Sequence, residues 1–267
     1  MSFTIAFAGK GGTGKTTLAA LAVRELTTRP GSILAVDADP NANLHEALGV
    51  DVERSVGEVT EDLMGSVDDL PPGMTKDVWM EYHIQQVLAE GPRFDVLSMG
   101  RPEGPGCYCY ANTLVRRYLD MLADSYEWVV VDNEAGMEHL SRRTTRDVDA
   151  LVLVSDPSVR GIRIAARLAG LADELRVCAG RKLLVVNRAR EPLAPALLAE
   201  ASAAGLAVTG VVPPDELIAE LDLGGRPTVE LPAASEAVGA VRRLVDAICD
   251  ATLSSAGAPA LCDGRET

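Results

Sequence analysis

The stretch Gly9-Lys10-Gly11-Gly12-Thr13-Gly14-Lys15-Thr16-Thr17 decides the fold of this 267-residue chain. It follows the apolar run at residues 3–8 and precedes an alanine- and leucine-rich segment that starts at Leu18. The stretch has the spacing G-x-x-x-x-G-K-[ST], which ends on Lys15 and Thr16. An apolar strand, a glycine-rich turn and a helix in this order predict a phosphate-binding loop (P-loop).

Each part of the loop has an expected task. Glycines leave the backbone N–H groups free to point at phosphate oxygens, and the start of the helix adds partial positive charge. We expect Lys15 to reach the β- and γ-phosphates and act in catalysis, and the Thr16 hydroxyl to hold Mg²⁺. The residues expected to bind ATP or ADP here are Gly9, Gly11, Gly12, Thr13, Gly14, Lys15, Thr16 and Thr17.

Composition narrows the class of protein. The length suits one large α/β domain, and 47% hydrophobic residues supply a sizeable core. The formal net charge of −14 argues against nucleic acid or an anionic membrane as a partner, since both attract basic patches. No apolar run reaches the roughly 18–20 residues that span a bilayer. These features favour a cytoplasmic protein.

Short apolar runs alternate with helix-like segments along the chain. The expected strands are residues 4–8, 33–36, 94–99, 128–132, 150–154, 182–186 and 207–212. The expected helices are residues 15–28, 78–90, 113–124, 160–175, 195–204 and 235–252. Continuous apolar strands between helices predict a mostly parallel sheet of seven or eight strands with helices on both faces. We therefore expect a single-domain α/β P-loop NTPase over residues 1–253, an acidic excursion at 51–75 and a disordered tail at 254–267.

Carboxylates follow two of the expected strands. Asp37 and Asp39 end the second strand, and Asp132 ends the fourth. Ligands of such sheets bind beyond the carboxyl ends of the strands, so these groups should meet the phosphates. We expect Asp39 to orient or activate the attacking water, Asp37 to assist Mg²⁺ through water or order the loop, and Asp132 to hold Mg²⁺ directly or through water. Asp-x-Asp-Pro is also a common turn sequence, which leaves a structural alternative open.

Three further positions near strand ends are weaker candidates. The amide of Asn187 can donate to and accept from an adenine edge, and the backbone around Pro213 is placed to face the base. On spacing alone, a turn former at the end of a strand is the simpler interpretation of Asn187. Glu134 is either a second acid or a carboxylate at a helix start. His139 follows the same strand, and a local hydrogen bond is the simpler reading of it.

Cys107-Tyr108-Cys109 lies in a glycine- and proline-rich stretch. Adjacent thiols at this spacing do not form an unstrained disulfide, and two thiolates fill only half of a tetrahedral site. Two copies meeting on the axis of a symmetric dimer would supply four sulfurs. Zn²⁺, Ni²⁺ and an iron–sulfur cluster all accept thiolate ligands, with the cluster the least favoured.

The loop resembles the deviant Walker A family. In that family the lysine at the position of Lys10 crosses a dimer interface to the partner's phosphates, so the resemblance implies a homodimer with Lys10 acting in catalysis as a trans-acting cation. The positions of Asn187 and Pro213 line the adenine pocket in that family.

A more specific resemblance is to the CooC family, the nickel-insertion ATPases that mature carbon monoxide dehydrogenase. The segments that carry it are residues 9–17, 37–40, 99–109 and 132–140. The resemblance implies an ATP-dependent homodimer in which Cys107 and Cys109 of both copies bind one nickel or zinc ion. Hydrolysis would then drive delivery to a client metalloenzyme, carbon monoxide dehydrogenase.

Two other functions share the nucleotide motifs. One is an iron–sulfur ATP-dependent reductase like the nitrogenase iron protein, although its two cysteines are well separated in sequence. The other is a positioning ATPase like MinD or ParA, which acts on a membrane or on DNA. The acidic total and the final helix, with Arg242-Arg243 in an otherwise apolar and acidic segment, make a poor membrane anchor.

Overall fold

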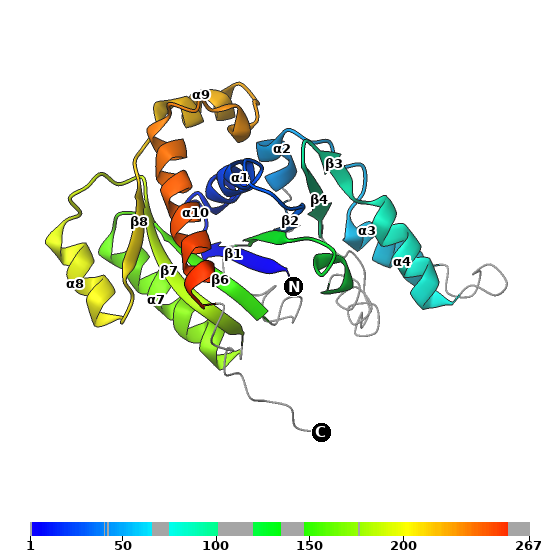
Figure 1. The fold of residues 1–267 in the computed structure, drawn as a ribbon, viewed down its shortest axis with the longest axis horizontal. Coiled ribbons are helices and arrows are strands. Elements are labelled where there is room, and N and C mark those ends of the chain that lie inside the picture. Colours follow the sequence, from blue (N-terminus) through cyan, green and yellow to red (C-terminus); the bar gives the residue numbers. More distant parts are fainter. Residues whose placement is uncertain are drawn as a thin grey trace.

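A computed structural model of the chain describes residues 2–39, 41, 43–65, 75–100, 120–134, 147–175 and 177–255. Their centre is an eight-stranded sheet in the order β3-β4-β2-β5-β1-β6-β7-β8 (Figure 1). The strands are β1 (Phe3–Gly9), β2 (Ile33–Ala38), β3 (Ala89–Gly91), β4 (Phe94–Ser98), β5 (Trp128–Asn133), β6 (Asp147–Ser155), β7 (Cys178–Asn187) and β8 (Val208–Val212). Every neighbouring pair is parallel except β3 and β4. The predicted mostly parallel sheet is confirmed.

Helices cover both faces of this sheet (Figure 1). One face carries α1 (Lys15–Leu26), α2 (Leu44–Leu48), α9 (Glu216–Leu223), the short 3₁₀ helix η1 (Thr228–Glu230) and α10 (Glu236–Ser255). The other carries α3 (Val56–Gly65), α4 (Lys76–Gln86), α7 (Val159–Glu174) and α8 (Pro195–Ala203). Side chains of β1 alternate between the layers, since Phe7 packs with the first set and Ala6 with the second.

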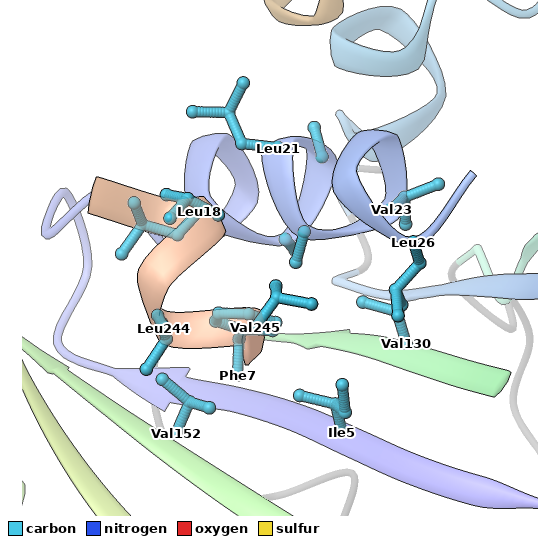
Figure 2. Packing of buried hydrophobic residues seen from close by; sticks show 14 of the residues in the cluster. Ile5, Phe7, Leu18, Leu21, Val23, Leu26, Val130, Val152, Leu244 and Val245 are labelled. Atoms are coloured by element: carbon cyan, nitrogen blue, oxygen red, sulfur yellow. The ribbon is translucent and has the colours of Figure 1, made fainter. Parts of the chain in front are cut away.

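The first layer anchors the helix that follows the P-loop. Figure 2 shows Leu244 of α10 beside Phe7 of β1, with Leu18 of α1 further up, on the other side of α10 from the sheet. These three side chains are at most 2% exposed, and each buried leucine contributes about 2 kcal/mol of hydrophobic stabilisation. Helix α1 is therefore fixed by the sheet below it and by α10 beside it, which holds the P-loop in place.

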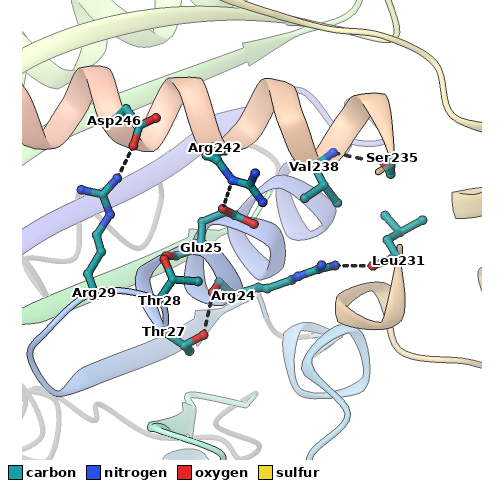
Figure 3. A network of polar contacts seen from close by, with 10 residues as sticks. All are labelled: Arg24, Glu25, Thr27, Thr28, Arg29, Leu231, Ser235, Val238, Arg242 and Asp246. Atoms are coloured by element: carbon teal, nitrogen blue, oxygen red, sulfur yellow. Dashed lines mark hydrogen bonds and ion pairs between the residues drawn. The ribbon is translucent and has the colours of Figure 1, made fainter. Parts of the chain in front are cut away.

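A polar network also joins α1 to the C-terminal part of the fold (Figure 3). Arg242 of α10 donates to Glu25 of α1 over 2.7 Å, and the Glu25 side chain is only 4% exposed. Arg29 pairs with Asp246, and Arg24 donates to the carbonyl of Leu231 just after η1. The buried charge of Glu25 thus has a cationic partner, the half-exposed Arg242, as burial of a charge requires.

The structure corrects several boundaries. The expected excursion at 51–75 contains α3, because Val56 and Val59 turn one helical face into the core. The helix expected at 78–90 ends at Gln86, and β3 then forms an antiparallel hairpin with β4. Helix α9 was not predicted, and α10 continues to Ser255, two residues into the expected tail. Across the described residues, no helix combines the length and apolar character needed to cross a membrane.

Candidate functional site

The P-loop joins β1 to α1 through backbone conformations that only glycine tolerates well. A Cβ on Gly9 would collide with the carbonyl oxygen of Val154 in the neighbouring strand β6. Gly14, immediately before α1, has φ +89°, and a Cβ there would collide with the Asn187 side chain. The predicted glycine positions thus have a steric reason, and Lys15 begins the helix whose N-terminus faces the loop.

The carbonyl oxygen of Lys10 is a shared hydrogen-bond acceptor inside this loop. It accepts hydrogen bonds from the Thr13 backbone N–H over 3.3 Å and from the Thr13 hydroxyl over 2.8 Å. The Lys15 ammonium group also donates to it, over 3.4 Å. Lys15 is buried, so its ammonium is held inside the loop where phosphate oxygens would meet it.

Two residues at the carboxyl end of β7 hold the loop from outside: Asn187, the last residue of the strand, and Arg188, which follows it. The Asn187 amide nitrogen donates to the Thr13 carbonyl over 2.8 Å, and its oxygen accepts from the Arg188 backbone N–H over 2.9 Å. The Arg188 guanidinium donates to the Gly12 carbonyl over 3.1 Å. Both ends of the Asn187 amide are therefore engaged within the chain. Turning loop carbonyls outward toward these donors leaves loop N–H groups available to an anion.

Asp132 faces the start of α1. Its Oδ2 accepts from the Thr16 hydroxyl over 2.5 Å, while its buried Oδ1 has no hydrogen-bond partner. The pKa of Asp132 is raised to about 7, chiefly by burial and also by the nearby Asp37 charge, against the lowering effects of Thr16 and Lys15. A cation near Oδ1 would favour the ionised carboxylate and satisfy that oxygen. Thr16 and Asp132 therefore fit the predicted Mg²⁺ position.

Asp37 and Asp39 leave β2 in different environments. Asp37 is fully buried and accepts from the Leu44 and Asp39 backbone N–H groups over 2.8 and 3.1 Å. Burial raises its pKa to about 6, although these two hydrogen bonds oppose the shift. Asp39 accepts hydrogen bonds from the backbone N–H and the side-chain amide of Asn41, as expected for the turn that the sequence left open as an alternative. Asp39 also lines the cavity described next. Asp37 thus orders the segment that carries Asp39.

A cavity of about 1110 Å³ opens above the loop. Its floor is formed by P-loop residues, and its walls by segments from α2, α9 and η1. Among the lining residues are Asp39, Glu134, Arg188 and Arg226. Pro213, expected beside the base, lines a separate hollow of about 560 Å³ near the start of α10. The described chain thus brings the P-loop, Asp39 and Glu134 to one cavity, while Pro213 borders another.

Lys10 and the cysteine pair complete the account of the predicted site. The Lys10 side chain is 50% exposed, and its ammonium lies 3.9 Å from Oδ2 of Asp156. Cys107, Cys109 and His139 lie outside the described residues. Within the described ranges no group of three or more His, Cys, Asp or Glu side chains has the arrangement of a metal site.

Arg188 and Asp156, which contact Gly12 and Lys10 of the P-loop, were not singled out from sequence. Each comes immediately after a parallel strand: Arg188 follows β7, and Asp156 follows β6. The sequence signal that could have identified them is therefore their position after a strand, because the carboxyl ends of parallel strands lie at one edge of the sheet, where the ligand binds. Their partners, a loop carbonyl and Lys10, lie far away in sequence.

Comparisons with known proteins agree with this geometry. Residues 4–229 match the CobQ/CobB/MinD/ParA nucleotide binding domain. An uncharacterized ATP-binding protein of Methanocaldococcus jannaschii is 43% identical over 246 residues, which cover 91% of this chain and 97% of that protein. The carbon monoxide dehydrogenase accessory protein CooC of Rhodospirillum rubrum is 34% identical over 184 residues, or 65% and 70% of the two chains. The septum site-determining protein MinD of Pyrococcus horikoshii, complexed with Mg-ADP, shares the fold with a TM-score of 0.69 at 20% identity, covering 97% of this chain and 100% of that one.

Proposed function

The chain belongs to the CobQ/CobB/MinD/ParA family of nucleotide-binding domains and is an ATPase, and on that premise we propose that it is an ATP-driven metallochaperone. Two copies pair around ATP, and Cys107 and Cys109 of both copies hold one nickel or zinc ion between them. Hydrolysis then separates the copies and releases the ion to a client metalloenzyme. We propose carbon monoxide dehydrogenase as that client.

The observation that carries this proposal is Cys107-Tyr108-Cys109 in a chain 34% identical to a carbon monoxide dehydrogenase accessory protein. Two thiolates per copy give four in a symmetric pair, the number that a tetrahedral nickel or zinc site requires. The exposed Lys10 side chain supports the pairing, because Lys15 already provides a buried ammonium inside its own loop.

The proposal gives a task to each residue of the nucleotide site. Lys15 leaves the Lys10 carbonyl to bind the β- and γ-phosphates, since a charged acceptor is stronger than a peptide carbonyl. Thr16 and Asp132 would hold Mg²⁺, and that ion would supply positive charge to the phosphates. Asp39 orients the attacking water from the cavity wall, and Asp37 fixes the segment behind it.

Transfer to water leaves ADP and inorganic phosphate. Lys10 of the partner subunit stabilises the charge that develops on the transferred phosphoryl group, in the way of an arginine finger. Because this cation comes from the second copy, hydrolysis depends on pairing. The four thiolates are brought together by the same event, which couples metal binding to the nucleotide.

Metal analysis of the purified chain with and without ATP tests this function. We expect one nickel or zinc ion per two chains in the ATP-bound pair, and less without nucleotide. The double variant Cys107→Ser, Cys109→Ser should lose this ion while it still hydrolyses ATP. Cys249→Ser is the matched control, because Cys249 is buried on α10. Unchanged metal stoichiometry in the double variant contradicts the metal site.

A positioning ATPase is the second candidate, because relatives of that kind also match. The maintenance of carboxysome distribution protein A of Synechococcus elongatus is 27% identical over 169 residues, covering 62% of each chain. Such a function predicts ATP-dependent binding to DNA or to anionic vesicles at low salt. The net charge of −14 disfavours both surfaces, so we expect no binding in either cosedimentation assay.

A further inference from the structure

Lys10 has a partner in its own subunit. Its ammonium lies 3.9 Å from Oδ2 of Asp156, and the two side chains are 50% and 34% exposed. The contact follows from the sheet, since β1 and β6 are parallel neighbours with Gly9 opposite Val154. The residues just beyond the ends of these two strands therefore lie next to each other.

The Asp156 carboxylate is oriented independently of Lys10. Its Oδ1 accepts a hydrogen bond from the Ser158 hydroxyl, and its backbone carbonyl accepts from the Ser158 N–H over 2.8 Å. Ser158 is in turn the N-cap of α7 and accepts from the Gly161 N–H over 2.9 Å. A Cβ at Gly161 would collide with Oδ1. The helix start thus fixes one carboxylate oxygen and leaves the other directed at Lys10.

The backbone of Lys10 is held by a group that ATP will recruit. The Lys15 ammonium donates to the Lys10 carbonyl over 3.4 Å, and phosphate oxygens compete for that ammonium. Nucleotide binding therefore removes one restraint on Lys10. The contact of the Lys10 side chain with Asp156 does not involve Lys15 and remains until another anion replaces it.

We propose that Asp156 is a positioning residue that keeps Lys10 against its own subunit until the phosphates of a nucleotide-bound partner compete for it. This inference rests on the proposed trans role of Lys10. An exposed ion pair shifts an equilibrium by about two- to fivefold, which biases Lys10 without trapping it. A residue that only caps α7 would have no effect on Lys10.

Acylation of lysines in the nucleotide-free chain tests the contact directly. A lysine ammonium held against a carboxylate reacts more slowly with an amine-acylating ester, because the contact must break before the amine can reach the ester. We expect Asp156→Asn to speed acylation of Lys10 about two- to fivefold, as read by peptide mass spectrometry, with Lys182 unchanged. Asn keeps an acceptor for Ser158, so α7 should start normally.

The matched control uses the pair Asp173–Lys182 at the far end of α7, in which the Asp173 side chain is 68% exposed and the Lys182 side chain 23% exposed. Asp173→Asn should speed acylation of Lys182 and leave Lys10 unchanged. An unchanged Lys10 rate in Asp156→Asn overturns the proposal. So does an equal acceleration of Lys10 and Lys182 in that variant, since it would report a general change.

Sedimentation with ATP then tests the consequence for pairing. Release of Lys10 should lower the protein concentration at half-maximal pairing about two- to fivefold in Asp156→Asn, with Asp173→Asn at the wild-type value. An unchanged or raised midpoint in Asp156→Asn overturns the restraint. A wild-type chain that remains monomeric with ATP contradicts the proposed function instead. In that case the acylation rates still test the contact between Lys10 and Asp156.

Discussion

The Thr16 hydroxyl donates to Asp132 over 2.5 Å and so joins the first turn of α1 to the end of β5. The second Asp132 oxygen is buried without a partner. An unsatisfied buried oxygen costs about 1–3 kcal/mol, and a carboxylate more. A cation or its bound water at this point removes the cost, which explains why two residues distant in sequence meet beside the P-loop.

Asp132→Asn should therefore weaken Mg²⁺ binding. We expect the Mg²⁺ concentration at half-maximal ATPase activity to rise about 10- to 100-fold, because the amide carries no charge. A Mg²⁺ titration of the hydrolysis rate measures it. Asp95→Asn is the control, since Asp95 accepts from the Tyr126 hydroxyl away from the cavity. Equal midpoints for the wild-type chain and Asp132→Asn would contradict this role.

Stability without nucleotide and Mg²⁺ should depend on pH through the same carboxylate. The pKa of Asp132 is about 7 in the folded chain against 3.8 for a free side chain. Between these values the folded chain binds more protons than the unfolded chain, so its free energy of unfolding falls as pH rises. The free energy of unfolding of Asp132→Asn should rise relative to that of the wild-type chain by on the order of 4 kcal/mol between pH 4 and pH 7.5. Urea unfolding in EDTA across that range measures the difference, and a constant difference would contradict the raised pKa.

Mixing two inactive variants should restore hydrolysis if Lys10 acts in trans. The Lys10→Ala variant has an intact nucleotide site but supplies no Lys10 to its partner. The Asp39→Ala variant supplies Lys10 to its partner but has a defective nucleotide site. Each alone should hydrolyse ATP about 10³-fold more slowly than the wild-type chain. An equal mixture should recover roughly a quarter of the wild-type rate, because half the pairs are mixed and each has one working site. A mixture that stays inactive while both variants bind ATP and pair contradicts the trans role.

The variant Asn187→Ala distinguishes two roles of this side chain, support of the P-loop and recognition of the adenine base. The amide is engaged by Thr13 and Arg188, so its loss should loosen the P-loop and weaken ATP and GTP binding equally, about fivefold. Fluorescence titration with both nucleotides measures this. A larger loss for ATP than for GTP would instead support the adenine contact expected from the sequence.

Breaking the ion pair between α1 and α10 should destabilise the fold. Arg242→Ala leaves the buried Glu25 carboxylate without its partner (Figure 3). We expect a loss of about 2 kcal/mol, less than for a fully buried pair because Arg242 is half exposed. Chemical denaturation measures it, with Arg243→Ala, the exposed neighbour, within about 0.5 kcal/mol of the wild-type chain. Equal losses for the two variants would contradict the role of the pair.

The sequence predicts the fold well where the hydrophobic pattern is continuous. All seven predicted strands are present, because strands buried on both faces read as uninterrupted apolar runs. The hairpin strand Ala89–Gly91 was missed, since three residues carry no detectable period. Helix α3 was not predicted, because its outward-facing acidic residues made the segment resemble a loop, although Val56 and Val59 face the core.

The candidate site divides in the same way. Lys15, Thr16 and Asp132 are predictable because the loop spacing and a strand ending in aspartate are local signals. Arg188 and Asp156 act through contacts with Gly12 and Lys10, which depend on the tertiary neighbours of their strands. No local pattern carries that information.

The packing of α1 against α10 has a consequence during synthesis. The apolar side chains of α1 emerge from the ribosome early, but their cover on α10 emerges roughly two hundred residues later. Until then α1 exposes the leucines that later pack over β1 (Figure 2). Until α10 has emerged, the nascent chain therefore lacks part of the packing that holds the P-loop, and its uncovered apolar surface favours aggregation.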